Sequence, residues 1–164
     1  MRAGTRLGVD VGTVRVGVAK SDPAGIVATP LETVPRNTKT QSDIERIADL
    51  VREWDVLEIV IGHPRSLSGV EGPAAHAAVA YAGAVARRLA PVPVRLVDER
   101  LSTVTAQRSL REAGVRGRKA RPVVDQVAAV VILQEALDTE RTSGRPPGAL
   151  VAPKWGPGRS GPQR

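Results

Sequence analysis

The first third of the chain alternates hydrophobic and polar positions with the two-residue period of β-strands. Gly12 and Thr13 interrupt the alternation and predict a tight turn between the first two strands. A short apolar run that ends at Gly62 is typical of a strand buried on both faces, and another follows Pro93. The five predicted strands cover residues 5–11, 14–21, 26–34, 57–61 and 94–97.

Helical periodicity marks other segments of the chain. Apolar residues from Ile44 to Val51 recur at the i, i+3, i+4, i+7 spacing of an amphipathic helix, and Ser42 with Glu45 has the pattern of a capping box at its start. The last helix begins at Pro122 and is expected to be the longest. The four predicted helices cover residues 42–54, 72–89, 103–111 and 122–137. Three strands followed by alternating helices and strands predict an α/β fold, a mixed β-sheet with helices on both faces.

Composition limits the possible functions. The 164 residues suffice for one core, and 2% aromatic residues supply few rings on which unpaired bases could stack. A net charge of +7 favours a polyanionic partner, above all nucleic acid, although excess arginine can also serve only to solvate a surface. The absence of cysteine excludes disulfides and thiolate chemistry. No apolar stretch approaches the roughly 20 residues of a membrane helix, and no signal segment precedes the first strand. We therefore expect a cytoplasmic protein with no membrane partner.

The domain is expected to cover residues 1–140. No acidic residue follows Glu140, and the basic, glycine- and proline-rich segment 141–164 is expected to be a disordered tail. Such a tail either gathers nucleic acid as a flexible arm or is a solvated terminus without a fixed role.

Asp10 is the first candidate for chemistry. It alternates with Gly8 and Gly12 along the first strand, so its carboxylate shares a face with positions that have no side chain. The alternative is a structural acid that caps the turn or pairs with Arg15.

Asp98 and Glu99 end the fifth strand, where α/β sheets commonly build their sites. Alternation directs the two side chains to opposite faces, and the pattern alone does not tell which one enters a site. The pair could instead satisfy the N-terminus of the following helix.

Asp125 lies in an apolar helical stripe with Ala128, Ala129 and Ile132. A buried carboxylate needs a metal ion or an arginine beside it, so the alternative to a ligand is a salt-bridged core acid.

Together the three acidic positions predict a cation site. Oxygen ligands without cysteine favour Mg²⁺ or Mn²⁺ over zinc, and neither His63 nor His76 is assigned a role. Two such ions roughly 3.5–4 Å apart could activate water for phosphodiester cleavage.

Four motifs resemble the YqgF family, nucleases similar to Holliday junction resolvases that are linked to maturation of the 5′ end of pre-16S rRNA. The opening stretch LGVDVGTVRVGVA, residues 7–19, matches the family's first motif. Gly62-x-Pro64 with Gly69 matches the loop after the central strand. Asp98-Glu99-Arg100-Leu101-Ser102-Thr103 matches the most specific signature, and Asp125 with Ala128-Ala129 matches the last helix. The resemblance covers residues 5–138; the loop after Gly62 departs from the family pattern through His63, Arg65 and the segment 66–68.

The resemblance implies an RNase H-like fold and a metal-dependent endonuclease in which Asp10, Asp125 and the Asp98–Glu99 pair are catalytic. Glu99 is favoured as the ligand by analogy with related resolvases. The substrate is expected to be pre-rRNA or branched DNA, and a junction resolvase would act as a homodimer. The residues expected to contact substrate are Thr13, Arg15, Arg100, Ser102, Thr103, Arg116, Arg118, Lys119 and Arg121.

Two other classes remain open. Asp10-x-Gly12-Thr13 also resembles the first phosphate loop of the actin, sugar-kinase and Hsp70 ATPases, but 164 residues without a second such loop do not supply two lobes. A catalytically silent nucleic-acid-binding protein would explain the charge, although it gives Asp125 no purpose.

Overall fold

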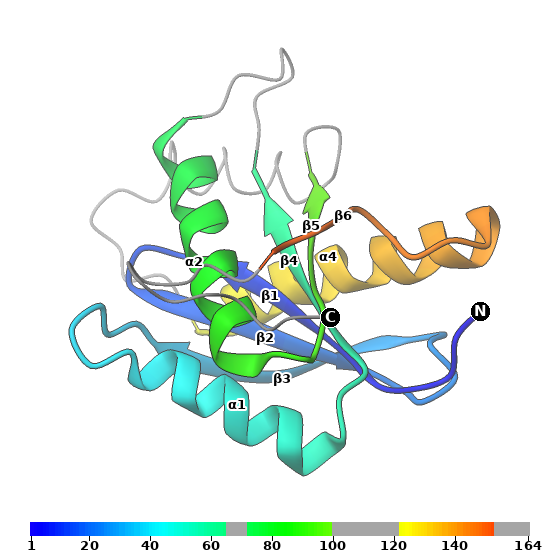
Figure 1. Cartoon of the computed structure of the whole chain (residues 1–164), viewed down its shortest axis with the longest axis horizontal. Helices are drawn as coiled ribbons and strands as arrows, with labels where there is room; N and C mark the ends of the chain where they lie inside the picture. Colours follow the sequence, from blue (N-terminus) through cyan, green and yellow to red (C-terminus); the bar gives the residue numbers. More distant parts are fainter. Residues whose placement is uncertain (65–71, 100–121, 153–164) are drawn as a thin grey trace.

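The computed structural model describes residues 1–64, 72–99 and 122–152, and of residues 122–125 it describes the backbone alone (Figure 1). Six strands of the described chain form one sheet in the order β3-β2-β1-β4-β5-β6. The strands are β1 Arg6–Val11, β2 Arg15–Ser21, β3 Ala28–Pro35, β4 Glu58–His63, β5 Val94–Asp98 and β6 Ala149–Leu150. The helices are α1 Ser42–Trp54, α2 Pro73–Leu89 and α4 Pro122–Ser143.

The sheet is mixed, as the sequence predicts. β1 pairs antiparallel with β2 and parallel with β4, β4 pairs parallel with β5, and β6 is antiparallel to β5. β1, β4 and β5 therefore run in one direction, and their carboxyl ends meet at one edge of the sheet.

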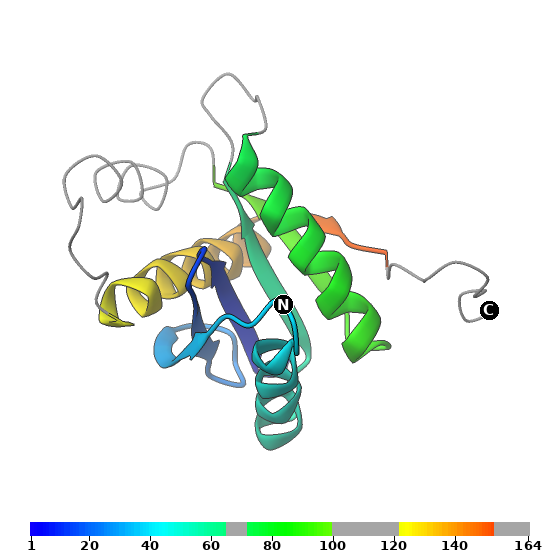
Figure 2. The same ribbon diagram turned by 90° about the vertical axis from the view of Figure 1, so that its left-hand side faces the viewer.

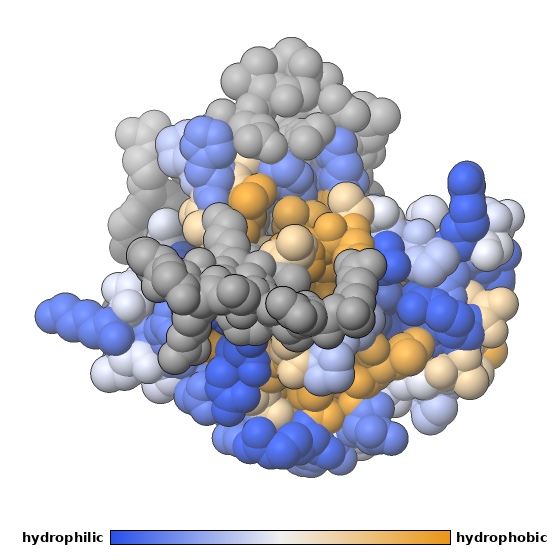
Figure 3. Space-filling model, in the orientation of Figure 1, coloured by the Kyte–Doolittle hydropathy of each residue, from blue (hydrophilic) through white to orange (hydrophobic). Residues whose placement is uncertain are grey.

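Helices cover both faces of the sheet, which confirms the predicted α/β architecture. Figure 2 shows the sheet between α4 on one side and α2 on the other. The larger apolar core joins the sheet to α1 and α2 through residues such as Val9, Ile47, Ile61 and Val85. A second core joins the opposite face to α4 through Ala129 and neighbouring residues. Hydrophilic side chains cover the outer surface of α1 (Figure 3).

Gly8 sets how closely α4 approaches the sheet. A Cβ at this position would lie 2.6 Å from the Cβ of Leu133 and 2.9 Å from the carbonyl oxygen of Ala129. The helix therefore packs against the bare backbone of β1.

A partly buried ion cluster fixes the far end of this helix. Glu140, near the end of α4, accepts hydrogen bonds from Arg2 at 2.6 Å and from Arg6 at 3.1 Å. Glu58 at the start of β4 binds Arg2 at 2.9 Å and Arg95 at 2.6 Å. Because Arg6 begins β1 and Glu140 lies near the end of α4, the helix runs antiparallel to β1, and its N-terminal half lies toward the strand's carboxyl end.

Two local predictions were wrong. Ser42 does not cap α1: the N-cap is Gln41 in the left-handed conformation (φ 56°), and the backbone N–H of Ser42 donates to Thr40 Oγ1. The third strand begins at Ala28 rather than residue 26, because Asp22 Oδ1 accepts the backbone N–H groups of Ile26 and Val27 in the preceding turn.

Part of the segment expected to be a disordered tail belongs to the folded domain. α4 extends to Ser143, and β6 adds to the sheet by pairing Ala149 with Leu96 and Leu150 with Arg95. The helix predicted at 103–111, the basic segment 116–121 and the end of the tail from residue 153 lie outside the described residues. No helix in the described part of the chain is long and apolar enough to cross a membrane.

Candidate active site

Two buried acids lie on the α4 face of the sheet at the edge where the parallel strands end. Asp10 near the end of β1 is 1% exposed, and Glu99 directly after β5 is 2% exposed. Alternation along β1 puts Asp10 on the face of Gly8, against α4, and alternation along β5 puts Glu99 on the face of Val97, which packs in the same core. The backbone N–H of Glu99 donates to the carbonyl oxygen of His63 at 3.3 Å, so the chain still follows β4 at this point.

Gly62 makes room for the second acid. A Cβ at Gly62 would lie 2.9 Å from Glu99 Oε1, so the Glu99 carboxylate lies directly against the bare backbone of β4. The register that pairs Val9 with Ile61 brings Asp10 beside Gly62 on the neighbouring strand. The structure thus brings Asp10 and Glu99 to the two sides of one glycine.

The structure also distinguishes Glu99 from Asp98. Asp98 is exposed. Along β5 it alternates onto the same side as Leu96, which packs in the core with α1 and α2 on the other face of the sheet. Strand alternation therefore directs Asp98 to the opposite face from Asp10 and Glu99, although Asp98 is the last paired residue of β5 and also borders the hollow between β5 and α4.

Asp125 lies in the first turn of α4, and its backbone position is described. It precedes Ala129, whose carbonyl oxygen lies against Gly8, by one helical turn. Because α4 runs antiparallel to β1, this turn extends from Gly8 toward the end of the strand that carries Asp10. Within residues 1–64, 72–99 and 126–152, no three Asp, Glu or His side chains form a group that could hold a metal ion.

The turn between β1 and β2 borders the two acids. The backbone N–H of Gly12 donates to the carbonyl oxygen of Arg15 at 2.9 Å, and Thr13 is exposed while Arg15 is half-buried. Arg36, at the end of β3, holds this turn from the side: its Nη1 donates to the Gly12 carbonyl at 3.0 Å and its backbone N–H donates to the Val14 carbonyl at 2.9 Å.

Sequence reasoning missed Arg36 and the two residues beside it. The Tyr81 hydroxyl donates to Asp43 Oδ2 at 2.9 Å, and the Arg36 guanidinium lies 5.3 Å from the centroid of the Tyr81 ring. Burial, reinforced by the negative charge of Asp43, raises the pKa of Tyr81, so its hydroxyl remains a donor. An acid in the first turn of a helix and the chain's single tyrosine were the only signals that the sequence offered.

Next to Glu99, β5 and α4 border a hollow of about 280 Å³, which Asp98, Glu99 and Glu135 line together with apolar residues. Burial, with the nearby charge of Asp138, raises the pKa of Glu135. Of the histidines, His63 is buried and His76 is exposed. The other residues predicted to bind substrate lie outside the described chain: Arg100, Ser102, Thr103, Arg116, Arg118, Lys119 and Arg121.

The sheet order and the helices on both faces are those of an RNase H-like fold. Residues 4–139 match the model of the RuvX family, described as Holliday junction resolvase, and the chain belongs to this family.

Two similar proteins carry the name "Putative pre-16S rRNA nuclease". The protein of Thermobifida fusca is 58% identical over 158 residues, 92% of this chain and 98% of its own. That of Streptomyces coelicolor is 55% identical over 151 residues, 92% of this chain and 90% of its own. Among solved structures, RuvC of T. thermophilus in complex with a Holliday junction substrate has a TM-score of 0.50 at 16% identity, covering 88% of this chain and 99% of that one. That likeness concerns the fold alone.

Proposed function

We propose that this nuclease is a metal-dependent endonuclease that hydrolyses phosphodiester bonds in the 5′ leader of pre-16S rRNA, in the cytoplasm. The observation that supports it most is the pair of buried carboxylates, Asp10 and Glu99, on either side of Gly62 at the carboxyl edge of the parallel strands. We propose Asp125, on the helix that packs over this edge, as the third acid.

The donor chemistry suits a divalent cation. Carboxylate oxygens are the ligands that Mg²⁺ and Mn²⁺ prefer, and two nearby buried acids are more stable with a cation beside them. Asp10, Glu99 and Asp125 would hold it, while Asp98, which strand alternation directs to the other face, would not. When bound, the cation would supply Lewis-acid activation of water and stabilise the leaving oxygen.

The chain's own residues would hold the substrate strand. The bare backbone at Gly62 keeps Glu99 close to β4, and the β1–β2 turn presents Thr13 and Arg15 at the edge of the site. We propose that Arg15 and Arg100 bind phosphates that flank the cut, with Ser102 and Thr103 beside them. The basic residues from Arg116 to Arg121 (Arg116, Arg118, Lys119 and Arg121) would bind phosphates farther along the strand.

The relatives' name favours RNA as the substrate, because the identity of 55–58% extends over nearly the whole of each chain. The family description favours a second candidate, resolution of a four-way DNA junction. Paired cuts in a junction would need a homodimer, whereas trimming one RNA strand would not.

Cleavage of a labelled pre-16S rRNA leader and of a four-way DNA junction, with Mg²⁺, Mn²⁺ or EDTA, tests the proposal. We expect the leader to be cut only with metal, and Asp125→Asn to abolish cutting while binding persists. Cutting of the junction alone would support the second candidate. Binding of both substrates without cutting either would refute the nuclease and leave a nucleic-acid-binding protein.

A further inference from the structure

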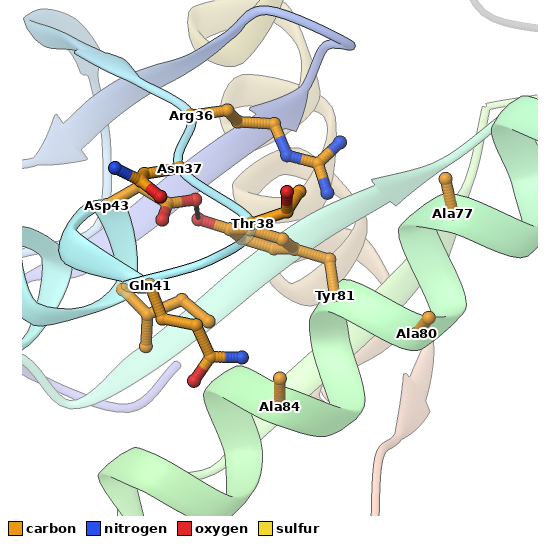
Figure 4. A pocket seen from close by; sticks show the side chains of 10 residues that line it. Arg36, Asn37, Thr38, Gln41, Asp43, Ala77, Ala80, Tyr81 and Ala84 are labelled. Atoms are coloured by element: carbon orange, nitrogen blue, oxygen red, sulfur yellow. Dashed lines mark hydrogen bonds between the residues drawn. The ribbon is translucent and has the colours of Figure 1, made fainter.

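A second polar hollow lies on the opposite face of the sheet from Asp10 and Glu99. It has a volume of about 200 Å³ and lies between α2 and the segment that joins β3 to α1 (Figure 4). Ala77, Ala80 and Ala84 form its wall on α2. Its other lining residues are Arg36, Asn37, Thr38, Gln41, Asp43, Ile44 and Tyr81.

Asp43 lines this pocket with a carboxylate of which only one oxygen accepts a hydrogen bond within the described residues. The side chain is 3% exposed, and its Oδ2 accepts the Tyr81 hydroxyl at 2.9 Å. Its Oδ1 is buried and has no hydrogen-bond partner within the described residues. A buried carboxylate oxygen without a donor is costly, so a ligand that brings an N–H group would stabilise the protein on binding.

Arg36 supplies the complementary donor. Its Nη1 is held by the Gly12 carbonyl at 3.0 Å, whereas its buried Nε has no acceptor in the part of the chain that the structure describes. Tyr81 connects the two groups, with its hydroxyl on Asp43 and its ring 5.3 Å from the Arg36 guanidinium.

This combination selects the chemistry of the occupant. A simple anion would be repelled by Asp43 and a simple cation by Arg36. A neutral, planar group with N–H donors and a carbonyl acceptor on one edge satisfies both residues, and its apolar face can lie against the alanines of α2. Guanine has this edge: its N1–H and amino group are donors, and O6 is an acceptor.

We propose that this pocket binds an unpaired guanine of the substrate strand, with N–H groups on Asp43 and O6 on Arg36. Arg36 also holds the turn that follows Asp10, at the same edge of the sheet, so the bound nucleotide would be a near neighbour of the cut. Sequence-specific readers of RNA commonly take single-stranded bases out of the stack in this way. The inference rests on the proposed function, because it takes the occupant from the nucleic-acid substrate.

Calorimetric titration of the full-length protein with GMP, AMP, CMP and UMP in EDTA tests the pocket without any cleavage. We expect GMP to bind roughly tenfold more tightly than the others, because one additional hydrogen bond to a charged group contributes about that factor to affinity. Ala80→Leu fills the pocket without removing a polar group and should abolish GMP binding. Ala24→Leu adds the same side chain to an exposed alanine in the β2–β3 turn, at the far end of the sheet, and should leave binding unchanged.

Asp43→Asn should remove the preference for GMP, because the amide nitrogen of asparagine is a donor where the carboxylate is an acceptor. The inference is overturned if the wild-type protein binds no mononucleotide, binds all four equally, or binds GMP equally well with Leu at position 80. A protein that binds GMP but cuts neither nucleic acid refutes the nuclease alone, and one that cuts but does not bind GMP refutes the pocket alone.

Discussion

Replacing Gly62 by alanine should damage the active site more than the fold. The added Cβ would lie 2.6 Å from Ile132 Cδ1 and 2.9 Å from Glu99 Oε1. The Ile132 methyl is the far end of a flexible side chain and can move away at small cost. The Glu99 carboxylate would have to move from its position beside β4, and with it one proposed oxygen ligand.

We expect Gly62→Ala to cost about 1–3 kcal/mol of unfolding free energy, the usual cost of overpacking by a methyl group. Cleavage should fall further, by about 10²-fold, because a misplacement of roughly 1 Å at a catalytic group has that effect. The assays are thermal denaturation and single-turnover cleavage across a Mn²⁺ titration.

Gly72→Ala is the matched control, since a Cβ there meets no atom of the described residues within 4 Å. Cutting by the Gly62 variant at the wild-type rate, with the wild-type requirement for Mn²⁺, would refute this expectation, because the position of Glu99 would then have no effect on cleavage.

Three further substitutions test how the scaffold holds the site. Gly8→Ala, whose Cβ would lie 2.9 Å from the backbone of α4, should cost about 1–3 kcal/mol in a denaturant titration, and unchanged stability would mean that the helix does not pack this closely. Burial opposes ionisation of Glu140, but hydrogen bonds and charge from Arg2 outweigh it and hold the pKa below its ordinary 4.5. The ionised Glu140 therefore stabilises the fold above about pH 4.5, and this stabilisation is lost as the pH falls through the lowered pKa. Glu140→Gln should reduce the fall in melting temperature at acid pH. A melting temperature that falls with pH as steeply as in the wild type would contradict this expectation. Tyr81→Phe removes the donor on buried Asp43 and should lower the unfolding free energy by about 1–3 kcal/mol, whereas equal stability would show that this hydrogen bond contributes nothing.

The sheet and its helices were predictable because their signals are local. The alternation in β1 and β2, the apolar run of β4 and the period of α1 each depend on residues within one element. The capping box was predicted wrongly because the N-cap of α1 depends on the loop before the helix, not on the helix sequence alone. Ser42 has the residue type of a cap, but the preceding loop, where Asn37 Oδ1 accepts two backbone N–H groups, makes Gln41 the cap instead.

The candidate acids could be named from the sequence, but their arrangement in space could not. Alternation alone leaves Asp98 and Glu99 on opposite faces without telling which face α4 covers. The packing of α4 on Gly8, Gly62 and Val97 decides this, and it is a contact between distant segments. Arg36 was missed for the same reason, because its partner, the Gly12 carbonyl, lies 24 residues away.

In the proposed site Glu99, and not its neighbour Asp98, completes the acid pair with Asp10. The most direct test compares Glu99→Gln with Asp98→Asn in single-turnover cleavage of the labelled pre-16S rRNA leader at saturating Mg²⁺. We expect Glu99→Gln to abolish cleavage while retaining binding to the leader and the wild-type melting temperature, and Asp98→Asn to cut at nearly the wild-type rate. Loss of cleavage in Asp98→Asn with normal cutting by Glu99→Gln would contradict this expectation.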